Sequence, residues 1–171
     1  MRIVPTESHV TIETAARGLL AAAAHDLRIE APIASGESED GLLCTARFAP
    51  ASMRVAESRR HGTSEWHDPS PKDARDIEER IRTEVFERLS EVVVEARVAS
   101  ADAARATVTV RAARTQTLEV PVRIERAGET TTVRGRCELS LSALGTGKVR
   151  IPLGAIKLED AVVVAFEVVL R

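Results

Sequence analysis

The residues best suited to metal chemistry are the four histidines, two of which share one polar segment. His61 and His67 lie with Asp68 between Ser58 and Pro69, which raises the hypothesis of a metal-dependent enzyme. Their six-residue spacing matches neither the helical nor the knuckle pattern of zinc ligands, and no paired cysteines complete a ligand set. We therefore expect solvated loop histidines, and we predict no metal site and no cofactor.

A second candidate for chemistry is the adjacent pair His25 and Asp26, which suggests a general base with its orienting carboxylate. Neighbouring residues of a strand point to opposite faces of the sheet, so these two side chains cannot easily hydrogen-bond to each other. We expect Asp26 to stabilise the turn into the strand and His25 to lie at one end of a barrel. An enzyme that uses His25 or the His61/His67 segment stays as an alternative, and we predict no catalytic residues.

The other motifs and the charge pattern argue against several function classes. Ser140 and Ser142 lack the Gly-x-Ser-x-Gly context of a nucleophilic serine, and Gly145-Thr-Gly147 is too short for a phosphate-binding loop. The 24 basic and 26 acidic residues are mixed along the chain and give a net charge of −2. No basic block or stripe is present, so we predict neither nucleic acid nor an anionic membrane surface as a partner.

The start of the chain predicts neither a membrane span nor an export signal. Its longest apolar run, Leu19 to Ala24, is far too short for a span and lacks a charged lead-in. Residues 1–14 alternate polar and apolar side chains as a strand does, so we expect a cytoplasmic protein. Cys44 and Cys137 are expected to be buried thiols, although the sequence leaves their redox state open.

The elements that must position these residues are strands, because apolar residues occupy every second position over most of the chain. A polar hairpin loop is expected at Ser35–Gly41, and Leu42–Glu57 is expected to form one strand bent at Pro50. Eight strands result, enough to close a single antiparallel barrel over residues 1–171. Their expected spans are 9–14, 26–33, 42–57, 92–98, 106–112, 118–124, 133–141 and 162–170.

One amphipathic helix, at Pro71–Leu89, interrupts this pattern. Ser70 is its expected N-cap, and Asp73 stands where a capping acid belongs. A narrow apolar stripe suits a helix that lies on the outside of a barrel or across one of its mouths. The stripe consists of Ala74, Ile77, Ile81, Val85 and Leu89.

The inner face of the expected barrel is built from small side chains. The chain has only three phenylalanines, one tryptophan and no tyrosine. An interior lined by Ala, Val, Leu and Ile leaves space, and an empty cavity costs about 24 cal/mol per Å³. Either the sheet collapses onto its own side chains, which would suit a protein-interaction module, or an apolar ligand occupies the interior.

The order of these elements and several short motifs resemble the YceI-like family. The resemblance rests on His25-Asp26-Leu27, the charged helix, Val133-Arg-Gly135, and the closing run Leu144-Gly-Thr-Gly, Leu153-Gly154 and Lys157-Leu-Glu-Asp160. It implies a lipocalin-like barrel with the helix alongside, an isoprenoid-type lipid inside the barrel, and, since several members dimerise, a homodimer as one expected state. Ala112-Ala-Arg-Thr115 and Leu89-Ser-Glu91 depart from the usual motifs of the family.

The sequence therefore predicts an all-β fold with one helix and a non-enzymatic protein that sequesters or carries an apolar lipid chain. Its partner would be that lipid rather than a nucleic acid. The ligand-binding residues we predict all lie on inward faces of strands. They are Leu27, Ile29, Val94, Val108, Val110, Val122, Ile124, Val133, Leu139 and Phe166.

Overall fold

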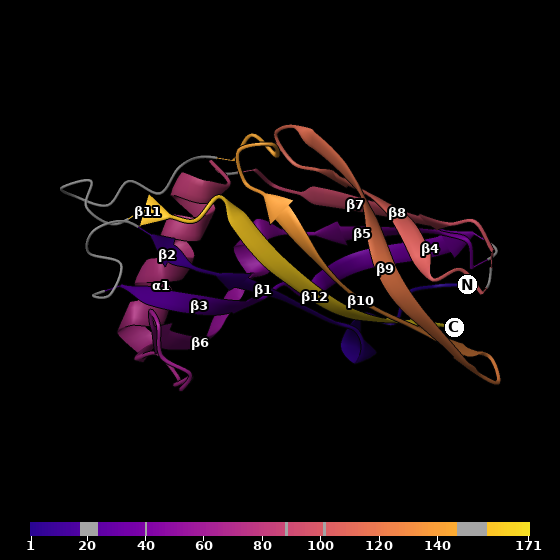
Figure 1. Ribbon diagram of the computed structural model, residues 1–171, viewed down its shortest axis with the longest axis horizontal. Helices are drawn as coiled ribbons and strands as arrows, with labels where there is room; N and C mark the ends of the chain where they lie inside the picture. Colours follow the sequence, from indigo (N-terminus) through magenta and orange to yellow (C-terminus); the bar gives the residue numbers. More distant parts are fainter. Residues whose placement is uncertain (18–23, 40, 88, 101, 147–156) are drawn as a thin grey trace.

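The computed structural model describes residues 1–17, 24–39, 41–87, 89–100, 102–146 and 157–171. Most of them form one antiparallel sheet (Figure 1). Its ten strands are β1 (His9–Thr14), β3 (His25–Glu30), β4 (Ile33–Glu39), β5 (Leu43–Phe48), β6 (Arg54–Arg60), β7 (Val92–Val98), β8 (Arg105–Arg111), β9 (Thr115–Ala127), β10 (Thr130–Ser140) and β12 (Ala161–Leu170). A separate two-stranded sheet joins β2 (Ala16–Arg17) to β11 (Lys157–Leu158).

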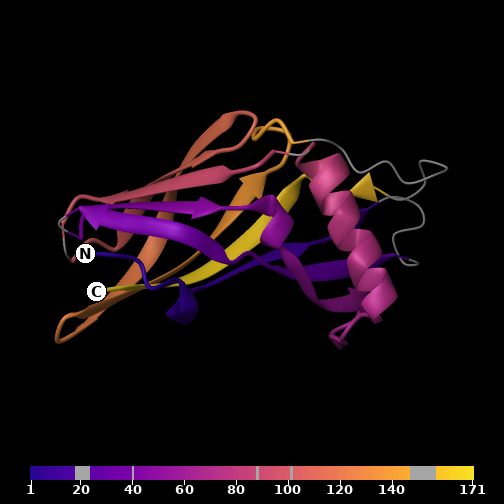
Figure 2. The same ribbon diagram turned by 180° about the vertical axis from the view of Figure 1, so that it is seen from behind.

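The large sheet curls into a half-barrel with one helix across one end (Figures 1 and 2). Its hydrogen-bonded order is β4-β5-β7-β8-β9-β10-β12-β1-β3-β6, so the edge strands are β4 and β6. The expected all-β fold with one helix is confirmed. The sheet has ten strands rather than the eight expected, because two of the expected strands are each divided at a bend.

Two of the expected strands bend so sharply that each supplies two strands to the sheet. The span 26–33 divides at Ala31–Pro32 into β3, which pairs with β1 and β6, and β4, which pairs with β5. The span 42–57 divides in the same way at the 3-10 turn η3 (Pro50–Ser52) into β5 and β6. Proline has no N–H to donate to a strand ladder, and this explains the position of both breaks.

The polar segment expected to be a hairpin loop is mostly strand β4. Gly36, Glu37 and Ser38 pair with β5 residues, so β4 extends to Glu39, and Asp40 lies outside the described residues. The other side of β4 is hydrogen-bonded to the start of the chain, with Ile3 N donating to Gly36 O and Ser38 N donating to Met1 O.

The N-terminal residues bridge the β4 edge to the end of β12. Arg2 pairs with Glu37, and Ile3 pairs with Leu170. Ile3 is 5% exposed, and its Cδ1 lies so close to Gly36 that a Cβ on that glycine would collide with it. In Figure 1 both chain ends lie at the opposite end of the half-barrel from the helix.

The helix begins where the sequence predicts and ends earlier. It comprises α1 (Pro71–Arg80) and a following π-helical turn, η4 (Ile81–Val85). The Ser70 side chain accepts a hydrogen bond from the Asp73 amide at 3.1 Å, which satisfies one of the free N–H groups of the first turn. The helical segment reaches Val85 rather than Leu89, because the i→i+5 bond from Phe86 N to Ile81 O closes its last turn.

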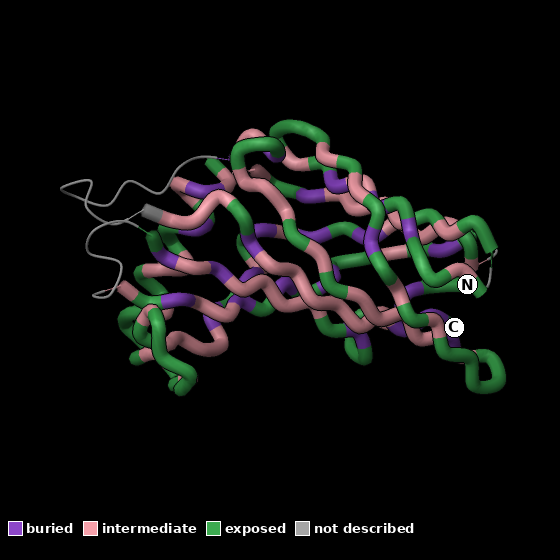
Figure 3. Tube along the Cα trace, viewed as in Figure 1, coloured by how far each residue is buried: buried purple, intermediate pink, exposed green. Residues whose placement is uncertain are grey.

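Buried or half-buried residues alternate with exposed ones along several strands, as the sequence pattern predicts (Figure 3). Inward positions such as Val108 and Val110 are buried, whereas the outer face carries ion pairs between neighbouring strands. Arg111 contacts Glu95 through two bonds of 2.6 and 2.8 Å, and Arg134 contacts Glu167 at 2.7 Å. Exposed pairs of this kind each stabilise a fold by roughly 0–1 kcal/mol, so inward packing is the larger contribution.

Replacing Ile3 with alanine is expected to loosen the end of the half-barrel next to the chain termini. The side chain is buried between β4 and β12, so its truncation should lower the free energy of unfolding by about 2–4 kcal/mol. Urea denaturation followed by circular dichroism measures this change. Arg2→Ala, at the exposed neighbouring position, should change stability by less than about 0.5 kcal/mol. Equal losses in the two variants would contradict the role given to Ile3.

Candidate ligand-binding cavity

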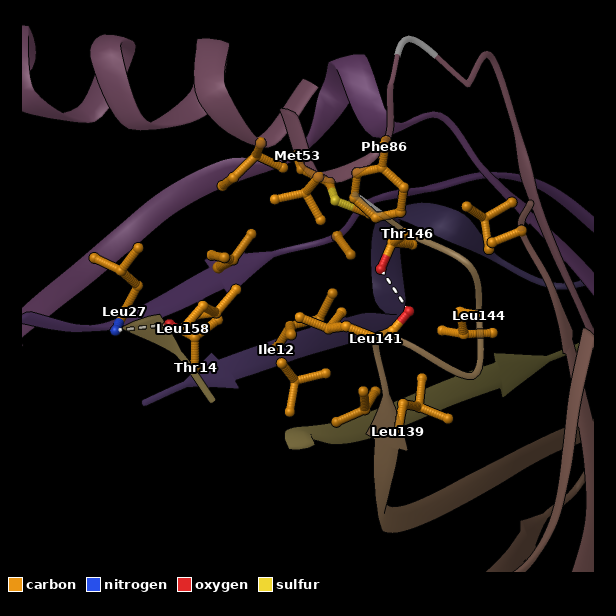
Figure 4. A pocket seen from close by; sticks show the side chains of 18 of the residues that line it. Ile12, Thr14, Leu27, Met53, Phe86, Leu139, Leu141, Leu144, Thr146 and Leu158 are labelled. Atoms are coloured by element: carbon orange, nitrogen blue, oxygen red, sulfur yellow. Dashed lines mark hydrogen bonds between the residues drawn. The ribbon is translucent and has the colours of Figure 1, made fainter. Parts of the chain in front are cut away.

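A cavity of about 420 Å³ lies between the inner face of the half-barrel and the helical segment α1–η4 (Figure 4). Strands β1, β3, β7, β8, β10 and β12 supply half of the lining residues, and the others come from the helical segment, the loop after β10 and positions next to the strands. Nearly all the lining side chains are aliphatic or aromatic. The exceptions are Thr14, His25, Arg80, Cys137 and Thr146.

Seven of the ten residues predicted from the sequence lie on the wall of this cavity. Because side chains alternate across a strand, residues two apart, such as Val108 and Val110, project into it from the same face. Their part in binding a ligand stays a prediction. The seven are Leu27, Ile29, Val94, Val108, Val110, Leu139 and Phe166.

The other three, Val122, Ile124 and Val133, are not part of the cavity wall. Ile124 pairs with Val133 in the part of the β9–β10 hairpin that leads to its turn (Figure 1). The cavity lies further along β10, at Cys137 and Leu139. Alternation identifies the inward face of a strand, but it does not say how far along that face a cavity extends.

The sequence-based set misses the residues that complete the wall. Ile77, Ile81 and Val85 belong to the apolar stripe of the helix, so the stripe was the signal that could have found them. Met53 follows the 3-10 turn after Pro50, and the connection after β10 adds Leu141 and Leu144, for which strand alternation gives no signal. Figure 4 shows Met53 and Phe86 together beneath the helix.

Phe166 occupies its place on the wall because its neighbour across the sheet is a glycine. Gly135 pairs with Phe166 in the β10–β12 ladder, and a Cβ on Gly135 would collide with the Phe166 ring. The ring therefore lies over the backbone of Gly135. Any other residue type at position 135 would have a Cβ that displaces the ring. Gly135 thus shapes the cavity without itself belonging to its wall.

The hydroxyl groups on the wall are hydrogen-bonded to the backbone rather than free for a ligand. Thr14 Oγ1 accepts a bond from Leu27 N at 3.3 Å, and Thr146 Oγ1 donates to Leu141 O at 2.8 Å (Figure 4). Burial raises the pKa of the Cys137 thiol, which keeps it neutral, and raises that of Cys44 to about 11. The cavity therefore presents a largely apolar surface.

The loop that contributes Leu141, Leu144 and Thr146 is held by Asp160. The Asp160 carboxylate accepts bonds from Ser140 Oγ at 2.6 Å, Ser142 Oγ at 3.0 Å and Ser142 N at 2.9 Å. Bonds from the Ser140 hydroxyl and the Ser142 amide lower the pKa of Asp160. Ser140 and Ser142, which were considered as nucleophiles, therefore donate hydrogen bonds that hold this loop to Asp160.

Asp26 belongs to a polar cluster with His61 rather than with His25. Its Oδ1 lies 2.7 Å from His61 Nδ1 and accepts a bond from Ala16 N at 3.2 Å, while Oδ2 accepts one from Arg59 Nε at 3.2 Å. Asp26 is 3% exposed. Burial alone would raise the pKa of Asp26, but the bonds from His61, Ala16 and Arg59 lower it overall. The ionised carboxylate anchors the start of β3, so the geometry does not support a His25–Asp26 general base.

The other histidine hypothesis also lacks support in the geometry. His67 is exposed, and its backbone pairs with Ser58, which places the loop over β6. In the part of the chain that the structure describes, no three His, Cys, Asp or Glu side chains are grouped so that they could hold a metal ion. His25 lies at the start of β3, where it borders the apolar cavity.

Two solved structures share this fold over nearly the whole chain. A polyisoprenoid-binding domain from Saccharophagus degradans, implicated in plant cell wall breakdown, has a TM-score of 0.68 at 10% sequence identity, over 98% of this chain and 95% of its own. BcnA of Burkholderia cenocepacia has a TM-score of 0.62 at 14% identity, over 99% of both chains. The shared feature is the fold.

Comparisons at the level of sequence give no match. No family model matches the chain, and no curated protein matches it. At identities of 10% and 14% the structural likeness concerns the fold alone, and a fold by itself does not fix a function. Among the described residues, no helix is both long and apolar enough to cross a membrane.

Replacing Asp26 with asparagine should remove an acid-sensitive part of the stability. Because the folded pKa of Asp26 lies below its ordinary value of 3.8, the carboxylate stabilises the fold above that pH, and this contribution is lost as pH falls through the lower folded value. We expect wild type to exceed Asp26→Asn in free energy of unfolding by about 1–3 kcal/mol near neutral pH. Urea denaturation at about pH 7 and about pH 3 should show the gap narrowing in acid.

The control for this measurement is Asp68→Asn, which changes an exposed carboxylate in the segment that also contains His61. It should leave the free energy of unfolding within about 0.5 kcal/mol of wild type. A gap between wild type and Asp26→Asn that is the same at both pH values would contradict the ionised role of Asp26.

Adding a methyl group at Gly135 should displace the Phe166 ring. We expect Gly135→Ala to lower the free energy of unfolding by about 1–3 kcal/mol, because the ring must leave its rotamer or the strands must separate. In a Phe166→Ala background the same substitution should cost much less, since the colliding atoms are gone. Chemical denaturation of the four proteins of this double-mutant cycle measures the coupling. Additive losses would show that the contact does not constrain the ring.

Proposed function

We propose that this chain is a non-enzymatic binding protein that holds one apolar, isoprenoid-like lipid chain in the cavity between the half-barrel and the helix, for sequestration or transport. The observation that carries the proposal is the cavity of about 420 Å³ with a nearly unbroken apolar wall. Pockets of roughly 300–1,000 Å³ with apolar walls are typical of small-molecule sites.

The energetics favour an occupied cavity over a void. A dry void of 420 Å³ would cost about 10 kcal/mol at about 24 cal/mol per Å³, which is comparable with the whole stability of a typical domain. A guest offsets this cost, since each buried methylene contributes about 0.8 kcal/mol. An alkyl or prenyl chain can therefore bind with little polar help.

The structural neighbours add support of a weaker kind. One of the two is a polyisoprenoid-binding domain, and its likeness covers nearly the whole of both chains. This is consistent with the resemblance of the sequence to the YceI-like family. The homodimer and the cytoplasmic location predicted from the sequence stay predictions.

The two alternative functions are less well supported. A barrel filled by its own side chains would leave no cavity of this size. An enzyme built on histidine would need His25 or His61 poised beside a reactive group, but His61 contacts the Asp26 carboxylate that anchors β3. We therefore favour binding over catalysis.

A pair of adjacent valines on β7 allows a direct test. Val94 lines the cavity, whereas Val93 pairs with Arg111 and Arg47 on the outer face, and both are partly buried. Val94→Phe should weaken binding of the uncharged polyene diphenylhexatriene at least about ten-fold, because the ring takes space from the guest. Val93→Phe should leave the dissociation constant within about two-fold. Fluorescence titration measures both.

Two outcomes would contradict the proposal. In the first, wild type takes up no diphenylhexatriene and native mass spectrometry after gentle purification shows no apolar adduct. In the second, Val93→Phe and Val94→Phe weaken binding equally, which would place the probe outside the cavity.

A further inference from the structure

One charged side chain stands on the wall of the apolar cavity. Arg80 is the last residue of α1, and it is the only arginine or lysine among the described lining residues. No aspartate or glutamate is part of the described wall. The described part of the wall therefore has an arginine and no carboxylate.

The placement of Arg80 on the helix separates it from the contact that holds the helix to the sheet. Glu78 Oε1 accepts a bond from Val55 N of β6 at 3.0 Å. Residues two apart on an α-helix point to nearly opposite sides, so Arg80 lies on the flank away from Glu78 and away from β6. Arg80 borders the cavity together with Ile77 and Ile81, and the residue as a whole is exposed. A long arginine side chain can cover apolar surface with its stem while its guanidinium stays in water.

Arg80 also differs from several arginines of the outer face that have carboxylate partners. Arg28, Arg111 and Arg134 each form ion pairs with glutamates, and Glu79 beside Arg80 pairs with Arg82. No carboxylate of a described residue lies within ion-pair distance, 4.0 Å, of Arg80. Its guanidinium is thus available to a ligand that enters the cavity.

An unpaired guanidinium at the edge of an apolar cavity favours a particular kind of ligand. Its planar set of donors matches the oxygens of a carboxylate or a phosphate, and the apolar wall beside it strengthens a charge pair relative to bulk water. A lipid whose chain lies along Val94 and Val108 could place such a headgroup at Arg80. A neutral headgroup would leave the charge without a partner.

We propose that the ligand is an anionic amphiphile: a single apolar chain that ends in a carboxylate or a phosphate, with the headgroup bound by Arg80 at the edge of the cavity. This inference rests on the proposed function and names the class of lipid that the same site selects. The two headgroups share the chemistry that Arg80 recognises, so the experiment compares both.

Three ligands with the same apolar chain isolate the headgroup: farnesol, farnesoate and farnesyl phosphate. Each is titrated against a diphenylhexatriene-loaded protein, below the concentration at which it self-assembles. Wild type should bind at least one of the anions about five-fold or more tightly than farnesol, since partly exposed ion pairs contribute up to about 1 kcal/mol. This preference should shrink as salt is raised. The tighter of the two anions identifies the headgroup as carboxylate or phosphate.

Arg80→Met keeps an apolar stem and removes the charge. It should reduce the preference for the anions to about one-fold while leaving the affinity for farnesol within about two-fold of wild type. Arg75→Met is the matched control, because Arg75 is exposed on the same helix and is not part of the cavity wall, so it removes the same net charge. This variant should retain the wild-type preference.

Equal affinity of wild type for all three ligands would overturn the inference and leave the proposed function intact. Loss of farnesol binding in Arg80→Met to the same extent as anion binding would also overturn it, because Arg80 would then act only by packing. Loss of the preference in Arg75→Met as well would show a general charge effect and count against the site. Failure of wild type to bind any of the three ligands or the polyene would instead contradict the proposed function itself.

Discussion

The backbone hydrogen bonds of the curled sheet hold its walls further apart than the inward side chains can reach. Strand spacing and curvature are set by the ladders from β5 through β12 to β6, whatever side chains the strands carry. The inward positions around the cavity are small, with Ala31, Val94, Val108 and Ala112 among them. The space between the walls follows from this mismatch between a rigid frame and short side chains.

The helical segment limits this space at one end of the half-barrel. It contributes Ile77, Ile81 and Val85 to the cavity wall. The π-helical turn changes the register at the end of the helix, so that Phe86 faces the cavity beside Met53 (Figure 4). On the facing wall, Phe166 reaches inward over Gly135. Phe86 and Phe166 are two of the three phenylalanines of the wall, and the geometry of the neighbouring backbone places both of them.

How much of this follows from the sequence depends on the range of the interaction. The helix start at Ser70 and the inward faces of β7, β8 and β12 follow from local patterns, and the structure reproduces them. Pro50 signals a bend, but nothing local shows that β5 and β6 then join opposite ends of the strand order. In the same way, strand alternation argues against His25 as the partner of Asp26, but it cannot identify the actual partner, His61, which is distant in sequence.

Trp66, the single indole of the chain, is clasped on the outer surface between Arg28 and Arg59, with ring centroids 4.3 and 4.5 Å from the two guanidinium carbons. It reports on a different side of the sheet wall from the one that a guest would touch. The fluorescence of Trp66 should therefore report whether the 61–70 loop is packed on the sheet. It should not change when a ligand enters the cavity. Trp66 fluorescence thus offers a measure of folding at the outer surface that is independent of whether the cavity is occupied.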